Sequence, residues 1–232
     1  MKIDKFLSGI AFFCLTAALL LTVIDRCCFD KGFYTREYTK CDTAASIEMS
    51  QEDLTASTDA LLDYLQGRRD DIVVDVTVSG YEQEVFNQRE TLHMKDVKVL
   101  YQKAILVRNI LAAAGAAILA GLLILRRKKG HRWSMLTTGY KAGACIIGAL
   151  ILFIAVWALS DFDAFWTSFH ELFFDNDLWL LDPNTSIMIN MFPDTFFFDL
   201  VLRIIVWFVG IMAVSGILIY QPWRIKKAVS ND

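Results

Sequence analysis

Long hydrophobic stretches alternate along the chain with polar segments. Four stretches hold at least 18 residues with few charges: 6–24, 104–125, 142–159 and 196–219. A helix needs about 20 apolar residues to cross the hydrocarbon core of a bilayer, and these stretches lack the two-residue alternation of barrel strands. The pattern predicts a polytopic α-helical membrane protein. Its four transmembrane helices are expected at 6–25, 103–125, 142–159 and 196–219.

The first stretch follows Lys2 and Lys5, as the hydrophobic part of a secretory signal peptide would. Its 19 apolar residues exceed an ordinary signal core. It ends at Asp25-Arg26-Cys27-Cys28, where neither a small-x-small cleavage site nor a lipoprotein signal is present. We therefore expect a retained signal anchor.

Basic residues gather in three short segments: the N-terminus, a loop at 126–141 and a tail at 220–232. These segments hold 11 of the 23 Lys and Arg and only two acids, so they carry +9 while the rest of the chain carries −12. Because basic residues stay on the cytoplasmic side, both termini and the 126–141 loop are expected inside the cell. The basic run at 126–129 is then a topology determinant, and nucleic-acid binding is not expected.

Two segments are left to face outward, 26–102 and 160–195. In the first, Ser50 to Asp53 resembles a capping box, and Gly67 is placed to terminate the helix that follows. Leucines lie at helical spacing between them: Leu54, Leu61, Leu62 and Leu65. Residues 72–78 alternate between apolar and polar as a strand does, and Gly80-Tyr81 is turn-like. We expect a small mixed α/β extracytoplasmic subdomain.

Helical periodicity returns at about Lys95 and continues without a breaker into the second span. His93 is therefore expected at or just before the N-terminus of that helix. The positive end of the helix dipole disfavours a charged imidazole there, and a neutral imidazole can act as a base. A histidine that only caps the helix fits the same pattern.

The second outer segment is rich in aromatic residues. One face of a predicted helix carries residues at helical spacing: Phe162, Phe165, Trp166, Phe169, Leu172 and Phe173. His170 lies at its polar edge, with Asp163 seven residues earlier on nearly the same stripe. Asp182-Pro183 resembles the start of a second short helix that ends before Pro193. The pattern predicts an aromatic re-entrant or interfacial element between spans three and four; a plain amphipathic surface helix remains open.

Charged residues interrupt two of the spans. Asp199 and Arg203 lie four apart in the last span, in the favourable order for a helical ion pair, and Arg108 lies near the start of the second. Charged groups inside spans usually face a cavity or a partner; for the arginines, snorkelling to the outer headgroups is the alternative.

Several common enzyme signatures are missing from the sequence. It contains no GxSxG, HExxH or P-loop pattern, which argues against a serine hydrolase, a zincin or an NTPase. Three of the five cysteines, Cys27, Cys28 and Cys41, fall in the outer segment without metal-ligand spacing. Neither a metal nor another cofactor is expected.

Two histidine-containing motifs are similar to those of a known family. Residues 86–98 read FNQRETLHMKDVK and residues 169–183 read FHELFFDNDLWLLDP, with Phe192-Pro193 and Phe196-Phe197 following. The early stretch FYTREY at 33–38 also fits. Together they resemble the bacterial lipoprotein intramolecular transacylases, the Lit-type integral membrane proteins. The resemblance covers essentially the whole chain, although the segment between Cys41 and Gly80 matches in pattern only.

The resemblance implies an acyl transfer within a diacylated lipoprotein, at the outer leaflet of the bacterial cell membrane. The sn-2 acyl chain of the diacylglyceryl-cysteine would move to the α-amine of that cysteine, leaving a lyso-form lipoprotein. The two histidines essential to the family match His93 and His170. We take the following as supporting or substrate-binding candidates: Asp96, Asp163, Asn176, Asp182, Arg108, Asp199 and Arg203. Diacylated lipoproteins and membrane lipid are the expected partners; the sequence sets no oligomeric state.

Two other functions are consistent with the pattern. The chain fits a non-catalytic accessory or lipid-binding protein whose histidines only rim a surface helix. It also fits an outer metal site built from both histidines and nearby acids. Convergence of His93 and His170 on one cavity would favour the enzyme over the accessory protein.

Overall fold

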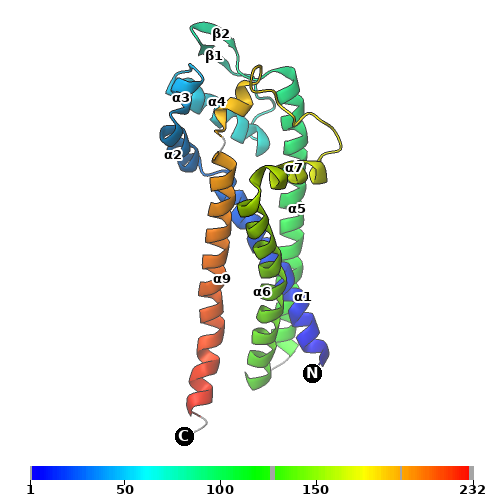
Figure 1. Cartoon of the computed structure of the whole chain (residues 1–232). Helices are drawn as coiled ribbons and strands as arrows, with labels where there is room; N and C mark the ends of the chain where they lie inside the picture. The colour runs from blue at the N-terminus through cyan, green and yellow to red at the C-terminus, as the bar shows by residue number, and fades with distance from the viewer. Residues whose placement is uncertain (1, 126–128, 194, 230–232) are drawn as a thin grey trace. The chain divides into compact units, whose positions relative to one another are not determined.

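The structure, a computed structural model, describes residues 2–125, 129–193 and 195–229. Figure 1 shows long helices joined by shorter helices and one hairpin. In chain order the elements are α1 (Lys2–Cys28), α2 (Lys31–Cys41), α3 (Thr43–Ser46), α4 (Gln51–Leu65), β1 (Asp75–Val78), β2 (Tyr81–Glu84), α5 (Gln88–Leu125), α6 (Lys129–Ser160), α7 (Phe162–Phe173), α8 (Ile187–Met191) and α9 (Phe196–Val229). Among the described residues four helices, α1, α5, α6 and α9, contain stretches long and apolar enough to cross a membrane.

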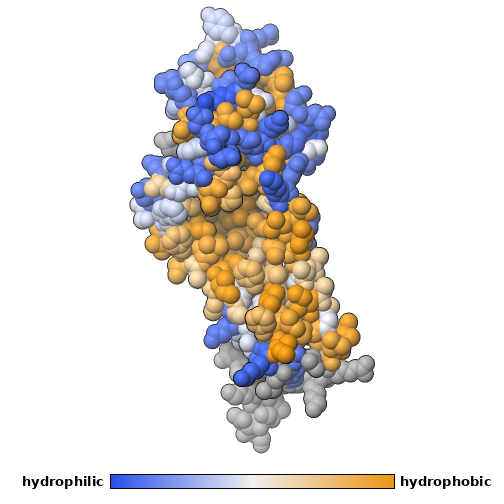
Figure 2. All heavy atoms as spheres, turned by 90° about the vertical axis from the view of Figure 1, so that its right-hand side faces the viewer, coloured by the Kyte–Doolittle hydropathy of each residue, from blue (hydrophilic) through white to orange (hydrophobic). Residues whose placement is uncertain are grey.

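The chain divides into two compact units, which we describe separately. The helical unit comprises Met1–Asp25, Ile105–Trp157 and Leu202–Asp232, and the mixed unit comprises Arg26–Ala104 and Ala158–Val201. Figure 2 shows mainly hydrophobic side chains on the visible surface of the long helices and mainly hydrophilic ones around the hairpin and short helices. Large apolar side chains stay exposed on the helical unit, among them Leu106, Ile124, Leu152, Phe153 and Leu218. Such a surface suits contact with lipid.

Two glycines let α1 and α6 approach closely in the helical unit. A Cβ atom added at Gly139 would lie 2.2 Å from the Oγ of Ser8, and one at Gly143 would lie 2.8 Å from the carbonyl oxygen of Phe12. The Ser8 hydroxyl donates to the carbonyl of Met135 over 2.9 Å. Small residues four apart commonly form such contacts between membrane helices.

Polar pairs connect other helices of this unit. The buried carboxylate of Asp4 lies 3.0 Å from Nε2 of His131, linking α1 to α6. Arg108 on α5 pairs with Asp25 on α1 over 2.9 Å. The Tyr140 hydroxyl of α6 donates to a carbonyl of α9. Each of these charged or hydroxyl groups therefore finds a partner within the helical unit.

The first half of the mixed unit follows the predicted local signals in part. Ser50 caps α4 by accepting from the backbone N–H of Asp53 over 2.9 Å, and Gly67 ends the helix in the left-handed region with φ 74. The predicted strand at 72–78 is shorter, since β1 covers only Asp75–Val78 and pairs antiparallel with β2, which we did not predict. The turn lies one residue earlier than expected, at Ser79-Gly80, where φ is 54 and 85. Positive φ at both positions is typical of a tight hairpin turn.

The predicted basic loop at 126–141 is wrong for most of its length. Helix α6 already begins at Lys129, so the described part of that segment is helical. Basic residues do not break a helix, and Gly130 and Gly139 are tolerated there. Hydrophobicity located the apolar part of the span but not the polar turns that precede it.

An aromatic cluster holds the start of α9 against α2 in the mixed unit. The Phe196 ring, which is fully buried, lies 5.1 Å from Tyr34, 5.2 Å from Phe33 and 6.4 Å from Tyr38 between ring centroids. Tyr38 also shares a 2.8 Å hydrogen bond with the Thr58 hydroxyl of α4. The FYTREY stretch thus forms part of the packed interior of this unit.

Candidate active site

Two histidines from different helices meet in the mixed unit. The ring centroids of His93 on α5 and His170 on α7 lie 6.1 Å apart, with ring planes tilted by 36°. Both side chains are buried, with 8% and 7% of their surface exposed. The structure therefore brings the two predicted histidines together, but in a packed interior and not at the polar edge expected for His170.

His93 lies in the second turn of α5, not at its N-terminus. The helix begins at Gln88 because Asn87 and Glu90 form a reciprocal cap. The Glu90 N–H donates to Asn87 Oδ1 over 3.0 Å, and the Glu90 carboxylate accepts from the Asn87 N–H over 2.6 Å. His93 comes one turn later, ten residues before the predicted span at 103–125. Our expectation of a helix starting near Lys95 missed this cap.

Burial keeps the His93 imidazole neutral. The pKa of His93 falls from the usual 6.5 to about 4, chiefly because burial disfavours the charged ring; nearby His170 and Arg89 lower it further and Asp96 partly opposes them. This shift favours the neutral ring expected from the sequence, and desolvation is its largest cause. Within the described residues, the buried Nδ1 of His93 has no hydrogen-bond partner.

The tautomer of His170 follows from its hydrogen bond. Its Nδ1 lies 2.8 Å from the carbonyl oxygen of Trp166, one turn earlier on α7. A carbonyl oxygen can only accept, so Nδ1 carries the proton and Nε2 keeps its lone pair. Burial lowers the pKa of His170, and the bond to Trp166 partly opposes that effect. His170 is therefore a neutral, oriented base near pH 7.

Aromatic rings surround the histidine pair. Trp166 and Trp179 each lie 4.8 Å from the His170 ring, and Trp179 stacks on it at 25°. Phe174 contacts both histidines, at 5.4 Å from His93 and 5.8 Å from His170. These rings exclude water from the imidazoles, which strengthens electrostatic interactions between them and any bound group.

Residues 174–181, which we call the strap, run from the end of α7 over one face of α5. Asn176 donates to the Asp96 carboxylate over 2.9 Å. Arg89 donates to the Asp177 carbonyl and lies 3.4 Å from its carboxylate. The Trp179 indole N–H donates back to the Asn176 carbonyl over 2.9 Å. Arg89, His93 and Asp96 share one helix face, so the strap is fixed on either side of His93.

The remaining predicted site residues fall elsewhere. Asp163 is exposed in the first turn of α7, whose cap is Asp161. Asp199 pairs with Lys40 of α2, and its predicted pair with Arg203 stays a prediction. Arg108 and Arg203 belong to the helical unit, where Arg108 pairs with Asp25.

The predicted helix start at Asp182-Pro183 is wrong. Asp182 instead closes a turn, with its carboxylate accepting from the Asn184 N–H over 2.9 Å and its carbonyl accepting from Ser186. Helix α8 begins at Ile187 and is capped by Ser186, whose hydroxyl accepts from the Ile189 N–H. The sequence is ambiguous here, because an Asp-Pro pair is common both in type I turns and at the N-terminus of helices.

Sequence reasoning missed Glu90, Arg89 and Trp179 as residues of the site. For Glu90 a signal was present, since Asn87-x-x-Glu90 is a capping-box pattern directly before the helical run. The Arg89–Asp177 contact joins residues 88 apart in sequence. The contacts of Trp179 with Asn176 and His170 depend on how the chain after α7 turns, which no periodic pattern encodes.

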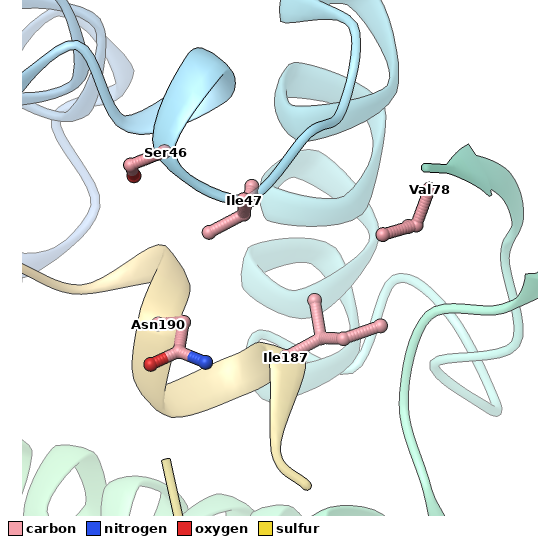
Figure 3. Close-up of a pocket in the computed structure, with 5 residues that line it drawn as sticks. All are labelled: Ser46, Ile47, Val78, Ile187 and Asn190. Carbon is pink, nitrogen blue, oxygen red and sulfur yellow. The ribbon is translucent and has the colours of Figure 1, made fainter. Parts of the chain in front are cut away.

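A separate cavity of about 400 Å³ lies in the mixed unit, beside α8. Figure 3 shows its lining side chains, from α3 and the residue after it, from β1 and from α8: Ser46, Ile47, Val78, Ile187 and Asn190. Neither histidine lines it. Within the part of the chain that the structure describes, no group of three or more His, Cys, Asp or Glu is arranged to hold a metal ion.

Comparison with known protein families shows the family to which this chain belongs. The family model of the lipoprotein intramolecular transacylase Lit matches residues 9–197, which is most of the chain. The chain belongs to this family. It is therefore an acyltransferase of the lipoprotein intramolecular transacylase type, as the motifs around His93 and His170 indicated.

Solved structures of a family member share the fold. The membrane-integral Lit of Bacillus cereus is 21% identical to this chain with a TM-score of 0.74, and the match covers 99% of each chain. Two variants of that protein, with one histidine replaced by arginine or by alanine, match with TM-scores of 0.72 at 21% identity, over 100% and 99% of this chain and 96% of theirs. The predicted four-span membrane fold is thus confirmed, and this Lit-family chain is a multi-pass membrane protein. A comparison with curated proteins finds no match.

Proposed function

We propose that this chain moves the sn-2 acyl chain of a diacylglyceryl-cysteine to the α-amine of the same cysteine. The substrate is then a diacylated lipoprotein and the product its lyso form. The observation that carries the proposal is the buried pair of neutral histidines, 6.1 Å apart, in a chain of the Lit family. Amine and ester belong to one molecule, so holding them together supplies effective concentration without a covalent enzyme intermediate.

Each histidine has a distinct role in the proposed reaction. The neutral amine attacks the ester carbonyl, and a C–N bond forms. Nε2 of His170 takes the proton that the nitrogen then loses, because Nδ1 is already committed to the Trp166 carbonyl. His93 supplies a ring N–H as a donor to the developing oxyanion. The C–O ester bond breaks, and the glycerol oxygen receives the proton from His170.

We further propose that the mixed unit lies on the extracytoplasmic side and works at the outer leaflet. The positive-inside distribution supports this orientation, with both termini in the cytoplasm. Exposed apolar residues near the site support contact with lipid: Leu172, Phe173 and Leu180 have 76%, 48% and 56% of their surface exposed. We propose that the acyl chain approaches the site from the bilayer on this side.

Mass spectrometry of lipoprotein N-termini, from cells with and without this chain, tests the proposal. We expect N-acyl, S-monoacylglyceryl cysteine only when the chain is present. His93→Ala and His170→Ala should each lower production about 10²–10⁴-fold per inserted protein, the usual contribution of one acid–base group. His131→Gln is the matched control, because this histidine pairs with Asp4 in the helical unit and should keep activity. Identical lipoproteins with and without the chain would support the accessory-protein alternative, and active histidine variants would remove these residues from the mechanism.

A further inference from the structure

Glu90 is a fully buried carboxylate that the proposed chemistry does not use. One oxygen accepts from the Asn87 N–H over 2.6 Å within the cap of α5. The other accepts from the Met188 N–H over 2.9 Å and from the Ser186 hydroxyl, at the start of α8. Capping α5 requires only the contact with Asn87, so the contacts of the second oxygen serve another structural role.

The second oxygen links Glu90 to residues that are distant in sequence: Ser186 follows it by 96 residues and Met188 by 98. Ser186 is the last residue of the stretch that joins α7 to α8. This stretch includes the strap, and Trp179 is part of the strap. Glu90 lies one turn before His93 on α5. The contact therefore closes a ring of structure that runs from His93 through Glu90, Ser186 and the strap to His170.

The contacts of this ring differ in strength. The Arg89–Asp177 pair is exposed, with 42% and 77% of the two side chains accessible, and exposed ion pairs contribute only about 0–1 kcal/mol. Removing a partner of a buried carboxylate costs more, because the group left behind is desolvated and unsatisfied. Glu90 is therefore the firm anchor of residues 186–188, which follow the strap, and the exposed contacts fix the strap itself only weakly.

We propose that Glu90 is a positioning residue of the acyl-transfer site. Its carboxylate anchors the stretch between α7 and α8 to the first turn of α5, and this anchor holds the His93 and His170 side chains at their observed distance and orientation. This inference rests on the proposed function. It adds a residue that touches neither the substrate nor the reacting atoms, and it acts through the two histidines.

The environment of His93 supplies a readout that a purely structural role would not change. The charged or titratable groups acting on it are His170 on α7 and Asp96 and Arg89 on α5, and burial is the largest influence on its pKa. Releasing Ser186 and Met188 from Glu90 would loosen the strap that precedes them and admit water to the ring. The pKa of His93 would then rise from about 4 toward its ordinary 6.5, and the acidic limb of the pH–activity profile would move to higher pH.

Glu90→Gln tests the inference with almost no change in size. A carboxamide has one oxygen and one NH₂, so it must present a donor either to the Asn87 N–H or to the pair at α8. We expect lyso-form production per inserted protein to fall at least about tenfold, in line with the loss of one buried charged hydrogen bond. Histidine-selective NMR in detergent micelles should show His93 titrating at higher pH. Glu84→Gln, which removes an exposed carboxylate of β2, is the control and should leave both unchanged.

Ser186 provides a second, milder test. Ser186→Ala removes one donor to Glu90 and should shift the His93 titration in the same direction, whereas Ser186→Thr keeps a hydroxyl and should restore it. The effects of Glu90→Gln and Ser186→Ala on activity should not be additive in the double variant, because both substitutions break the same hydrogen-bond network.

Unchanged His93 titration and activity in inserted Glu90→Gln would overturn the inference. If that variant fails to insert, an unchanged titration in Ser186→Ala would overturn it instead. A wild-type chain that makes no lyso-form would refute the proposed function, while the titrations would still decide the role of Glu90.

Discussion

A buried imidazole ties the stability of the mixed unit to pH. In an unfolded chain the His93 ring titrates near 6.5, but in the folded unit its pKa is about 4. Between these values the unfolded state binds a proton that the folded state does not, so the free energy of unfolding falls as pH drops from 6.5 to 4. The total loss is about 3 kcal/mol, and full stability is present above 6.5.

Thermal unfolding in detergent at pH 7, 5.5 and 4 should show this loss. His93→Gln removes the titrating ring, so its stability should depend less on pH over the same interval. Glu171→Gln, an exposed neighbour of His170, should retain the wild-type dependence. A His93→Gln protein that lost as much stability on acidification as the wild type would show that other groups control the acid response.

At the level of elements, the contact between α1 and α6 depends on glycine. Gly139→Ala would place a methyl group 2.2 Å from the Ser8 Oγ and 2.7 Å from the Phe12 ring, so the helices must separate. Overpacking of this kind costs about 1–3 kcal/mol. Gly148→Ala, on the same helix with nothing within 4 Å of the new atom, should be neutral or slightly stabilising. Melting temperatures of the two variants, measured in one detergent, compare them directly; equal values would mean that α1 and α6 do not pack this closely.

Local sequence signals predicted elements well where a single residue or a short repeat determines the start, end or length of the element. Ser50 and Gly67 marked the ends of α4, and hydrophobic length found the four spans. Strand β2 gave no signal because its residues Tyr81–Glu84 are all exposed, and its pairing depends on the preceding Ser79-Gly80 turn. Helix α6 began earlier than expected because helix formation does not require the apolar residues that mark a span.

For the site, the sequence identified the two histidines but not what holds them. His93 and His170 stood out through their motifs, whereas the Glu90–Ser186 contact joins residues 96 apart. No periodicity encodes such a partner, because it depends on how the stretch after α7 folds back on α5. The burial of both rings was missed for the same reason, since Phe174 and Trp179 come from that stretch.

At the scale of the whole molecule, charge distribution predicts which side of the membrane each segment faces. A reporter that is active only outside the cytoplasm should be active when inserted at the exposed Asp70 of the mixed unit. The same reporter should be inactive when inserted at residue 128, in the basic segment 126–129. Basic residues anchor the second site on the cytoplasmic side.

The reverse pattern of reporter activity would place the histidine pair in the cytoplasm. Diacylated lipoproteins held in the outer leaflet would then be out of reach. A reporter after the C-terminal residue serves as a further control, because it should follow the signal at residue 128 and not the one at Asp70.

The acids of α1 leave the ribosome long before the groups that pair with them. Arg108 follows Asp25 by 83 residues, and His131 follows Asp4 by 127. Asp25 closes the predicted first span, where a charged group is costly unless it is paired, whereas Asp4 lies before that span. The first helix therefore acquires its final neighbours only after α5 and the beginning of α6 have been synthesised. The Arg108–Asp25 and His131–Asp4 pairs therefore form late in synthesis, in the order in which α5 and α6 emerge.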